Sequence, residues 1–374
     1  MPALQVRLAV SAIALATLFR AFVVGDVRIP QRAGTGMGVP ASFIAAVDTM
    51  KESRDMDMSC RGGWTLCLTD ADIAEDVRTT VALGVTHVTV DTFYDHPAVM
   101  ARWVRAVRLA GKHVWFRPTW ISWEGSYGMA GTMTPARYIG ATTTFIRAHR
   151  GLFHPGDILD PLPEPENSPY WARTSPFGND WAWKNTPNAT TDAYNSFFVD
   201  LTGAVLDALA ASGVVGVRTD IRSVGAWFAA HPQTLYPATV ARLGRLTVDM
   251  YPGQDPHVAP SHALEDLRSS VTGLEKLWGV PLTIGELGYT VAPRALVSDS
   301  QQDAVLKLQF AWLAAQPYVD GLNYWHGAGY PAPDIWNGAS LFKGTTGAWT
   351  PRPAAFALSA MFAARVRPQT TARR

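Results

Sequence analysis

Two glutamates in this 374-residue chain lie where their carboxyl groups could work on one chemical bond. Glu286 ends an apolar run and lies between two glycines, in PLTIGELGYT. Glu164 lies between two prolines in DILDPLPEPENSPYW, and these prolines must end the preceding strand because proline cannot donate to a sheet. Two carboxyl groups that meet across a substrate can supply a proton donor and a nucleophile. The simpler interpretation of Glu286 is an ion pair with an arginine at the same edge.

The sequence lacks the motifs of several other chemistries. There is no GxSxG motif for a serine hydrolase, no HExxH or HxH pair for a metal, and no lysine at a predicted strand end for a Schiff base. The stretch GTGMG has the wrong spacing for a dinucleotide-binding turn. A net charge of +1 gives no electrostatic footprint for nucleic acid. We therefore expect no cofactor, no metal and no nucleic-acid partner.

Helices and strands alternate along the chain from about residue 70. Helical spacing of apolar residues, with capping signals, predicts helices over 70–84, 96–112, 134–151, 190–213, 234–244, 261–279, 299–320 and 351–366. β-Branched and apolar runs predict strands over 85–95, 113–120, 214–222, 245–252, 280–290 and 321–329, with another from residue 157 and a first strand near 36–46. Such alternation implies a parallel sheet with right-handed crossovers. Eight units predict a single-domain α/β fold, the (β/α)8 TIM barrel, and an open doubly wound sheet is the alternative.

Active sites of such barrels lie at the C-terminal ends of the strands, so the residues there are the functional candidates. Carboxylates and aromatic residues dominate these positions. Glutamates after strands four and seven would face each other across a closed barrel, as glycoside hydrolysis requires. Flat aromatic faces suit sugar rings. The predicted substrate contacts are Trp120, Trp123, Glu166, Asn167, Trp171, Tyr251, Asn323 and Trp325.

The region from about 70 to 365 resembles the retaining glycoside hydrolases of clan A, in particular the cellulases and mannanases of family 5. The resemblance implies a (β/α)8 barrel with Glu164 as the acid/base after strand four and Glu286, in GELG, as the nucleophile after strand seven. It further implies that Tyr251 hydrogen-bonds the nucleophile and that Trp325 lies under the sugar. Pro163 stands where the family has an asparagine that contacts the sugar 2-hydroxyl. Glu166 with Asn167 therefore offers an alternative register for the acid.

The N-terminal residues 1–26 predict a signal peptide or membrane anchor, because Arg7 precedes an apolar run over 8–19. Residues 27–374 would then form the catalytic domain outside the cytoplasm, secreted or tethered to a membrane. A first amphipathic helix is the alternative. Cys60 and Cys67 could close a small disulfide or remain two separate thiols.

These observations together predict a retaining β-glycoside hydrolase that acts on a β-linked oligosaccharide or polysaccharide by double displacement. Its partner is the carbohydrate substrate. The alternative is a catalytically silent barrel that binds glycan without cleaving it, which the missing asparagine before Glu164 favours. The sequence does not name the sugar or its linkage.

Overall fold

The computed structural model describes residues 43–56, 60, 67–120, 133–165, 191–225, 235–252, 259–289, 298–328, 338–344 and 348–366. The chain divides into two compact units, Met1–Pro40 and Ala41–Arg374, and every described residue belongs to the second. The predicted N-terminal segment 1–26 lies outside the described residues. None of the helices described is both long enough and apolar enough to cross a membrane.

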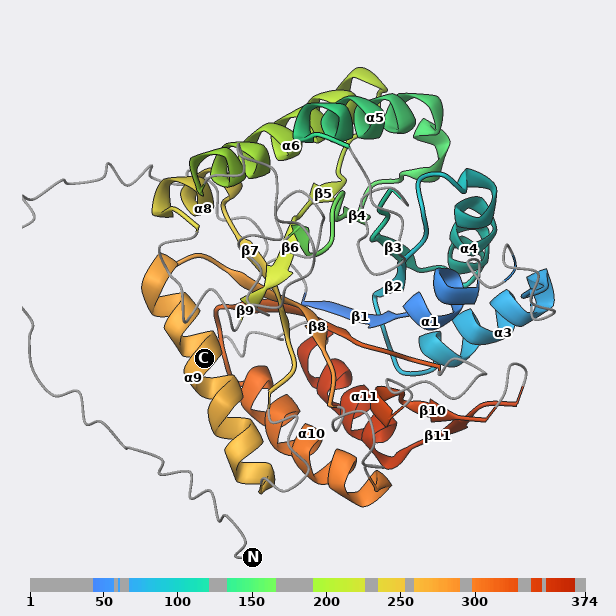
Figure 1. Cartoon of the computed structure of the whole chain (residues 1–374). Helices are drawn as coiled ribbons and strands as arrows, with labels where there is room; N and C mark the ends of the chain where they lie inside the picture. Colours follow the sequence, from blue (N-terminus) through green and yellow to red (C-terminus); the bar gives the residue numbers. More distant parts are fainter. Residues whose placement is uncertain are drawn as a thin grey trace, which may run out of the picture. The chain divides into compact units, whose positions relative to one another are not determined.

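A curled parallel sheet forms the centre of the described unit (Figure 1). Its strands are β1 (Ile44–Asp48), β2 (His87–Val90), β3 (His113–Phe116), β4 (Ile158–Leu159), β5 (Arg218–Thr219), β6 (Arg222–Val224), β7 (Leu246–Met250), β8 (Leu282–Leu287) and β9 (Val319–Tyr324). Their order is β5-β4-β3-β2-β1-β9-β8-β7-β6. Only Asp220 and Ile221 separate β5 from β6, so these two segments share the fifth position of an eight-position barrel. The predicted (β/α)8 fold is confirmed.

Helices surround the sheet, as alternating strands and helices require (Figure 1). They are α1 (Met50–Ser53), α3 (Asp70–Val81), α4 (Pro97–Leu109), α5 (Pro135–Ala148), α6 (Thr191–Ala211), α8 (Pro237–Leu243), α9 (Pro260–Trp278), α10 (Asp299–Ala314) and α11 (Pro353–Val366). Thr69 caps α3 in a capping box with Asp72, and Thr134 caps α5 as predicted. Gly244 and Gly279 end α8 and α9 in the left-handed conformation. A two-stranded antiparallel ribbon, β10 (Phe342–Lys343) with β11 (Thr350–Pro351), precedes α11.

The structure shifts several predicted boundaries and adds one helix. The helix expected over 299–320 ends at Ala314, and Val319 already belongs to β9. The first strand, Ile44–Asp48, ends two residues later than the strand expected near 36–46. Residues 36–42 lie outside the described part. The short helix α1 was not predicted at all. Cys60 and Cys67 form a disulfide, which decides between the two alternatives for these cysteines.

The barrel interior is apolar in one layer and charged in the next layer toward the carboxyl ends of the strands. Ala46, Trp115 and Ile158 pack together inside the sheet. Two residues further along the same strands, Asp48, Arg117 and Asp160 are buried as well. Side chains two residues apart share one face of a strand. The carboxyl ends of the strands therefore bring charged groups into the interior above an apolar floor.

A bulge in β8 places Glu286 in this interior. The register between β7 and β8 shifts so that Val248 pairs with Ile284 but Asp249 pairs with Glu286, which leaves Gly285 as the extra residue. Without this insertion, the alternation along the strand would give the inner position after Thr283 to Gly285. Bulges often redirect a side chain beside an active site. Here the bulge turns Glu286 inward and sends Leu287 to the outer core.

Candidate active site

Glu286 lies at the end of β8 with two strong hydrogen-bond donors. Arg117 Nη1 is 2.5 Å from Glu286 Oε1, and the Tyr251 hydroxyl donates to Oε2. The two donors come from different parts of the barrel, since Tyr251 follows β7, which pairs with β8, and Arg117 follows β3, which is separated from β8 by β9, β1 and β2. A carboxylate held on both oxygens has a fixed orientation. The hydrogen bond from Tyr251 to Glu286 is the one that the family resemblance implied.

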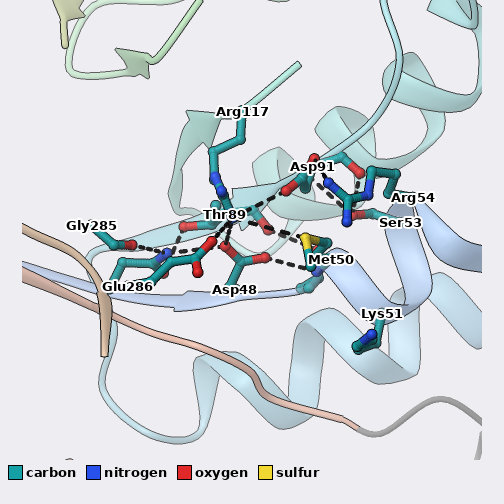
Figure 2. A network of polar contacts seen from close by, with 12 residues as sticks. Asp48, Met50, Lys51, Ser53, Arg54, Thr89, Asp91, Arg117, Gly285 and Glu286 are labelled. Carbon is teal, nitrogen blue, oxygen red and sulfur yellow. Dashed lines mark hydrogen bonds and ion pairs between the residues drawn. The ribbon is translucent and has the colours of Figure 1, made fainter. Parts of the chain in front are cut away.

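Arg117 is the central cation of the site, as Figure 2 shows. Besides Glu286, its Nη1 lies 2.9 Å from Asp48 Oδ2 and 3.1 Å from Asp91 Oδ2. Burial disfavours its charge, but Glu286, Asp91 and Asp48 outweigh burial and raise the pKa of Arg117 further above its ordinary value. A permanently charged guanidinium with fixed geometry is suited to holding several carboxylates at once. The lone arginine inside the apolar run HVWFRPTW was the sequence signal for this role.

Glu164 follows β4 and is half-buried. Its backbone φ is +43°, in the left-handed region that residues other than glycine rarely adopt. Carboxylate oxygens of Glu164, Asp249 and Glu286 all lie within 4.8 Å of one another. The structure therefore brings together the two glutamates singled out in the sequence. A strained backbone at such a position is typical of functional sites.

Asp249 is the third carboxylate and had no predicted role. It lies in β7, two residues before Tyr251, and is only 1% exposed. Burial, followed by the charges of Glu286 and Glu164, raises its pKa well above the ordinary value. Burial also raises the pKa of Glu286, with Arg117 acting in the opposite direction. Three carboxyl groups this close cannot all be ionised at low cost, so the titration of each depends on the others.

The neighbouring Asp91 belongs to the same network. Arg54 Nη1 lies 3.7 Å from Asp91 Oδ1, and Ser53 Oγ hydrogen-bonds the backbone of Asp91. Burial raises the pKa of Asp91 to about 7, although Arg54 and Arg117 both lower it. The short helix α1 thus delivers charged and polar groups to the barrel mouth (Figure 2).

Trp325 forms an apolar wall beside Glu286. Its side chain is 3% exposed and packs with Met50 and Ala339. The ring of Tyr251 meets it edge-on, with centroids 5.5 Å apart, and Lys51 Nζ lies 5.5 Å from the centroid of the Trp325 ring. The ring is thereby fixed from several sides. Its place beside the nucleophile candidate is compatible with the predicted contact to a sugar.

Two other residues predicted to contact substrate make contacts within the protein itself. Trp120 stacks on Tyr94, with centroids 5.0 Å apart, and its Nε1 donates to Thr142. Asn323 is fully buried, and its amide donates to Asp48 Oδ2 and to the carbonyl of Gly285. Asn323 thus braces the bulge beneath Glu286, and Trp120 joins the outer core. Direct sugar contact by either residue stays a prediction.

Four further predicted contacts lie outside the described residues: Trp123, Glu166, Asn167 and Trp171. The choice between Glu164 and Glu166 therefore rests on the position of Glu164 alone. Within the described part of the chain, the set Glu164, Asp249 and Glu286 also has the spacing of a metal site. Carboxylate oxygens are the ligands that Mg²⁺ and Ca²⁺ prefer. The same three groups could hold a proton between them instead.

The fold is that of (β/α)8 glycoside hydrolases. No family model and no curated protein matches the sequence. Solved structures do match. An endo-β-1,4-glucanase from Xanthomonas axonopodis pv. citri superposes with a TM-score of 0.56 at 13% identity, over 87% of this chain and 100% of that chain.

Two other structural matches differ in how much of the other chain they span. A GH5_18 protein from Bifidobacterium longum subsp. infantis gives a TM-score of 0.54 at 17% identity, over 79% of this chain and 74% of that chain. A GH2 β-galacturonidase from Eisenbergiella tayi gives 0.55 at 13% identity, over 86% of this chain. This chain spans 51% of that protein's length. The clan A resemblance seen in the sequence is confirmed as a likeness of fold.

Replacing Tyr251 with phenylalanine should remove the hydrogen bond that its hydroxyl donates to Glu286. A hydrogen bond to a charged group contributes about 1.5–3 kcal/mol, so the rate of a reaction in which Glu286 is the nucleophile should fall by about 10- to 100-fold. The matched control is Tyr236→Phe, because the Tyr236 hydroxyl also donates to a carboxylate, that of Asp192, at 2.6 Å on the protein surface. Steady-state kinetics of both variants test this. Equal rates for Tyr251→Phe and the control would contradict a role for Tyr251 in positioning Glu286.

Replacing Asp249 with asparagine should stabilise the protein relative to wild type by an amount that grows as the pH rises. The unfolded chain ionises Asp249 near pH 4, whereas the raised pKa in the folded protein keeps the proton bound to higher pH. Between these two values the folded state binds more protons, so wild-type stability falls as pH rises through that window. Asparagine does not titrate, so the variant lacks this loss of stability. The free energy of unfolding of the variant should gain about 1.4 kcal/mol over wild type for each pH unit in the window.

Denaturant unfolding at several pH values measures this gain. The control is Asp266→Asn, whose side chain is 45% exposed. Its difference from wild type should not change with pH in the same way. A pH-independent difference for Asp249→Asn would show that Asp249 does not carry the raised pKa.

Proposed function

We propose that this protein is a retaining β-glycoside hydrolase, with Glu286 as the nucleophile and Glu164 as the acid/base. The observation that carries the proposal is the approach of the Glu164 and Glu286 carboxylate oxygens to within 4.8 Å. Retaining enzymes place their two carboxyl groups about 5–5.5 Å apart, whereas inverting enzymes need about 6.5–9.5 Å to admit a water molecule. The close pair supports double displacement.

In the first step, Glu164 donates its proton to the glycosidic oxygen while Glu286 attacks the anomeric carbon. The aglycone leaves, and a covalent glycosyl ester forms on Glu286. Arg117 and the Tyr251 hydroxyl hold the two Glu286 oxygens, so the attacking lone pair is fixed in direction. In the second step, Glu164 accepts a proton from a water molecule, which attacks the same carbon and releases Glu286.

The substrate we propose is a β-linked oligosaccharide or polysaccharide. Its sugar would rest against Trp325, whose ring meets that of Tyr251 next to Glu286. The similar protein from Xanthomonas axonopodis pv. citri supports this substrate class, since it is an endo-β-1,4-glucanase and the match spans the whole of that protein and 87% of this chain. The disulfide between Cys60 and Cys67 supports a location outside the cytoplasm, because such bonds persist in oxidising compartments.

A panel of aryl β-glycosides and β-linked polysaccharides tests the proposal. We expect hydrolysis of at least one member, with the first-formed product in the β configuration by proton NMR. Turnover should persist in the presence of a chelator. An α-configured first product would contradict retention and indicate an inverting mechanism.

The second candidate is a barrel that binds glycan without cleaving it. It is favoured by Pro163, which stands where the clan A enzymes have a substrate-binding asparagine. Oligosaccharide binding without hydrolysis of any aryl glycoside would support this candidate over the first.

A further inference from the structure

A cavity of about 260 Å³ lies apart from Glu286, between α1, α3 and α4. Apolar side chains make most of its wall, including Met56, Val99 and Trp103, and the disulfide of Cys60 closes one side. The carboxyl-bearing residue in the described wall is Glu52. Small-molecule sites commonly combine an apolar wall with a few polar groups.

Glu52 is an unusual residue to find in such a wall. Its side chain is 2% exposed, and among the residues that the structure describes only its own backbone N–H approaches the carboxylate as a donor. The helix α1 fixes its direction, because Met50 on the same helix packs against Trp325 at the barrel mouth. Glu52 points instead toward α3 and α4. A buried polar group without a partner is costly and calls for an explanation.

The charges around Glu52 leave an excess of negative charge. Asp76 of α3 faces it, and Asp76 Oδ2 is buried without a partner in the described part of the chain. Arg102 also lines the cavity, but its Nε lies 2.6 Å from Asp70. Lys51 Nζ lies 3.0 Å from Asp55. Burial, together with the charges of Asp76 and Asp55, raises the pKa of Glu52 well above its ordinary value. A cation in the cavity would offset the negative charge of Glu52 and Asp76.

We propose that this cavity binds a small organic cation, consisting of a primary ammonium group on a short apolar body. The ammonium group would donate to the Glu52 carboxylate, which receives no hydrogen bond from another residue of the described part of the chain. The apolar body would pack on Met56, Val99 and Trp103. A divalent metal ion fits less well, because Mg²⁺ and Ca²⁺ take six or more oxygen ligands and this wall is mostly apolar. The site is separate from the proposed glycosidase centre.

Thermal unfolding with n-butylammonium tests the proposal without using catalysis. At about ten times its Kd, the ligand should raise the unfolding midpoint by about 2 °C. The same concentration of n-butanol, which has the apolar body without the charge, should leave the midpoint unchanged. The shift should be larger at pH 8 than at pH 5, because burial and the carboxylates of Asp76 and Asp55 outweigh the opposing charge of Lys51 and keep Glu52 protonated until the pH rises.

Three variants complete the test. Glu52→Gln should abolish the shift, whereas Glu265→Gln, at a side chain that is 69% exposed on α9, should keep it. Val99→Phe should fill the cavity and abolish the shift even if Glu52→Gln does not fold. The proposal is overturned if n-butylammonium at tens of millimolar produces no shift, if n-butanol produces the same shift, or if Val99→Phe keeps it. These outcomes do not depend on whether the protein cleaves glycosides.

Discussion

Replacing Glu286 with glutamine should reduce turnover of every cleaved glycoside by more than about 1,000-fold. Glutamine keeps the size and the hydrogen-bonding oxygen but cannot form the glycosyl ester that double displacement requires. The fold should tolerate the change, because burial already disfavours the Glu286 charge. Arg117 keeps its contacts to Asp48 and Asp91 in the variant.

The control for this experiment is Glu265→Gln on α9, which changes the same side chain at an exposed position. Rates are compared by steady-state kinetics, and folding by the unfolding midpoint. Oligosaccharide binding by Glu286→Gln should persist, since Trp325 and Tyr251 are untouched. Full activity in this variant would remove Glu286 from the mechanism. Loss of both folding and activity would instead assign Glu286 a structural role through its ion pair with Arg117.

The sequence predicted the position of Glu286 along the chain but not its direction. The motif GELG showed an apolar strand ending in a charge, which is enough to place the residue at a strand end. Strict alternation from Thr283 would have pointed Glu286 away from the interior. Only the bulge at Gly285 reverses this, and a bulge depends on pairing with β7, which lies more than thirty residues earlier in the chain. Register between distant strands is a tertiary property that local patterns do not contain.

Helices were predicted well where local chemistry determines their ends. Thr134 with Pro135 begins α5, and Gly279 ends α9, because capping and left-handed conformations depend on neighbouring residues. The boundary after Ala314 was missed, although Pro317 between α10 and β9 is a local signal that ends a helix. The helical spacing of apolar residues continues past it, and the prediction followed that spacing.

The charged network was the least predictable part of the site. Arg117 was visible as a lone cation in an apolar strand, but its three carboxylate partners come from β1, the end of β2 and β8. Asp48 was missed because the first strand was placed too early. Asn323 was expected at the substrate, yet it braces Asp48 and Gly285 from below. Residue types at strand ends indicate which groups gather there, and the pairing among them follows from the closed barrel.

Glu164 was recognised from its flanking prolines, and its conformation supplies an independent argument. A residue before proline prefers extended backbone, and Glu164 departs from this preference with a φ of +43°. Such a conformation costs about 1–3 kcal/mol and persists only when the surroundings enforce it. The cost is understandable if the strained turn aims the carboxyl group at Glu286. No such conformational argument is available for the alternative register, because Glu166 and Asn167 lie outside the described residues.

Replacing Glu164 with alanine should therefore separate the two chemical steps. Substrates with a poor leaving group need its proton, so their kcat/KM should fall by more than about 1,000-fold. Aryl glycosides with an acidic leaving group, such as 2,4-dinitrophenol, need little protonation, so their kcat/KM should fall by about 10-fold or less. The glycosyl ester on Glu286 would then accumulate, because no base activates the water. Azide, which needs no base, should restore turnover and yield a β-glycosyl azide.

The matched comparison is Glu166→Ala, two residues further along the chain. If Glu164 is the acid/base, Glu166→Ala should neither depend on the leaving group nor respond to azide. The reverse pattern would transfer the role to Glu166 and leave the double displacement intact. If neither variant discriminates between leaving groups, no carboxyl group of this segment protonates the departing oxygen. The close approach of Glu164 to Glu286 would then be explained by the proton that these groups share with Asp249, and the proposed mechanism would fail.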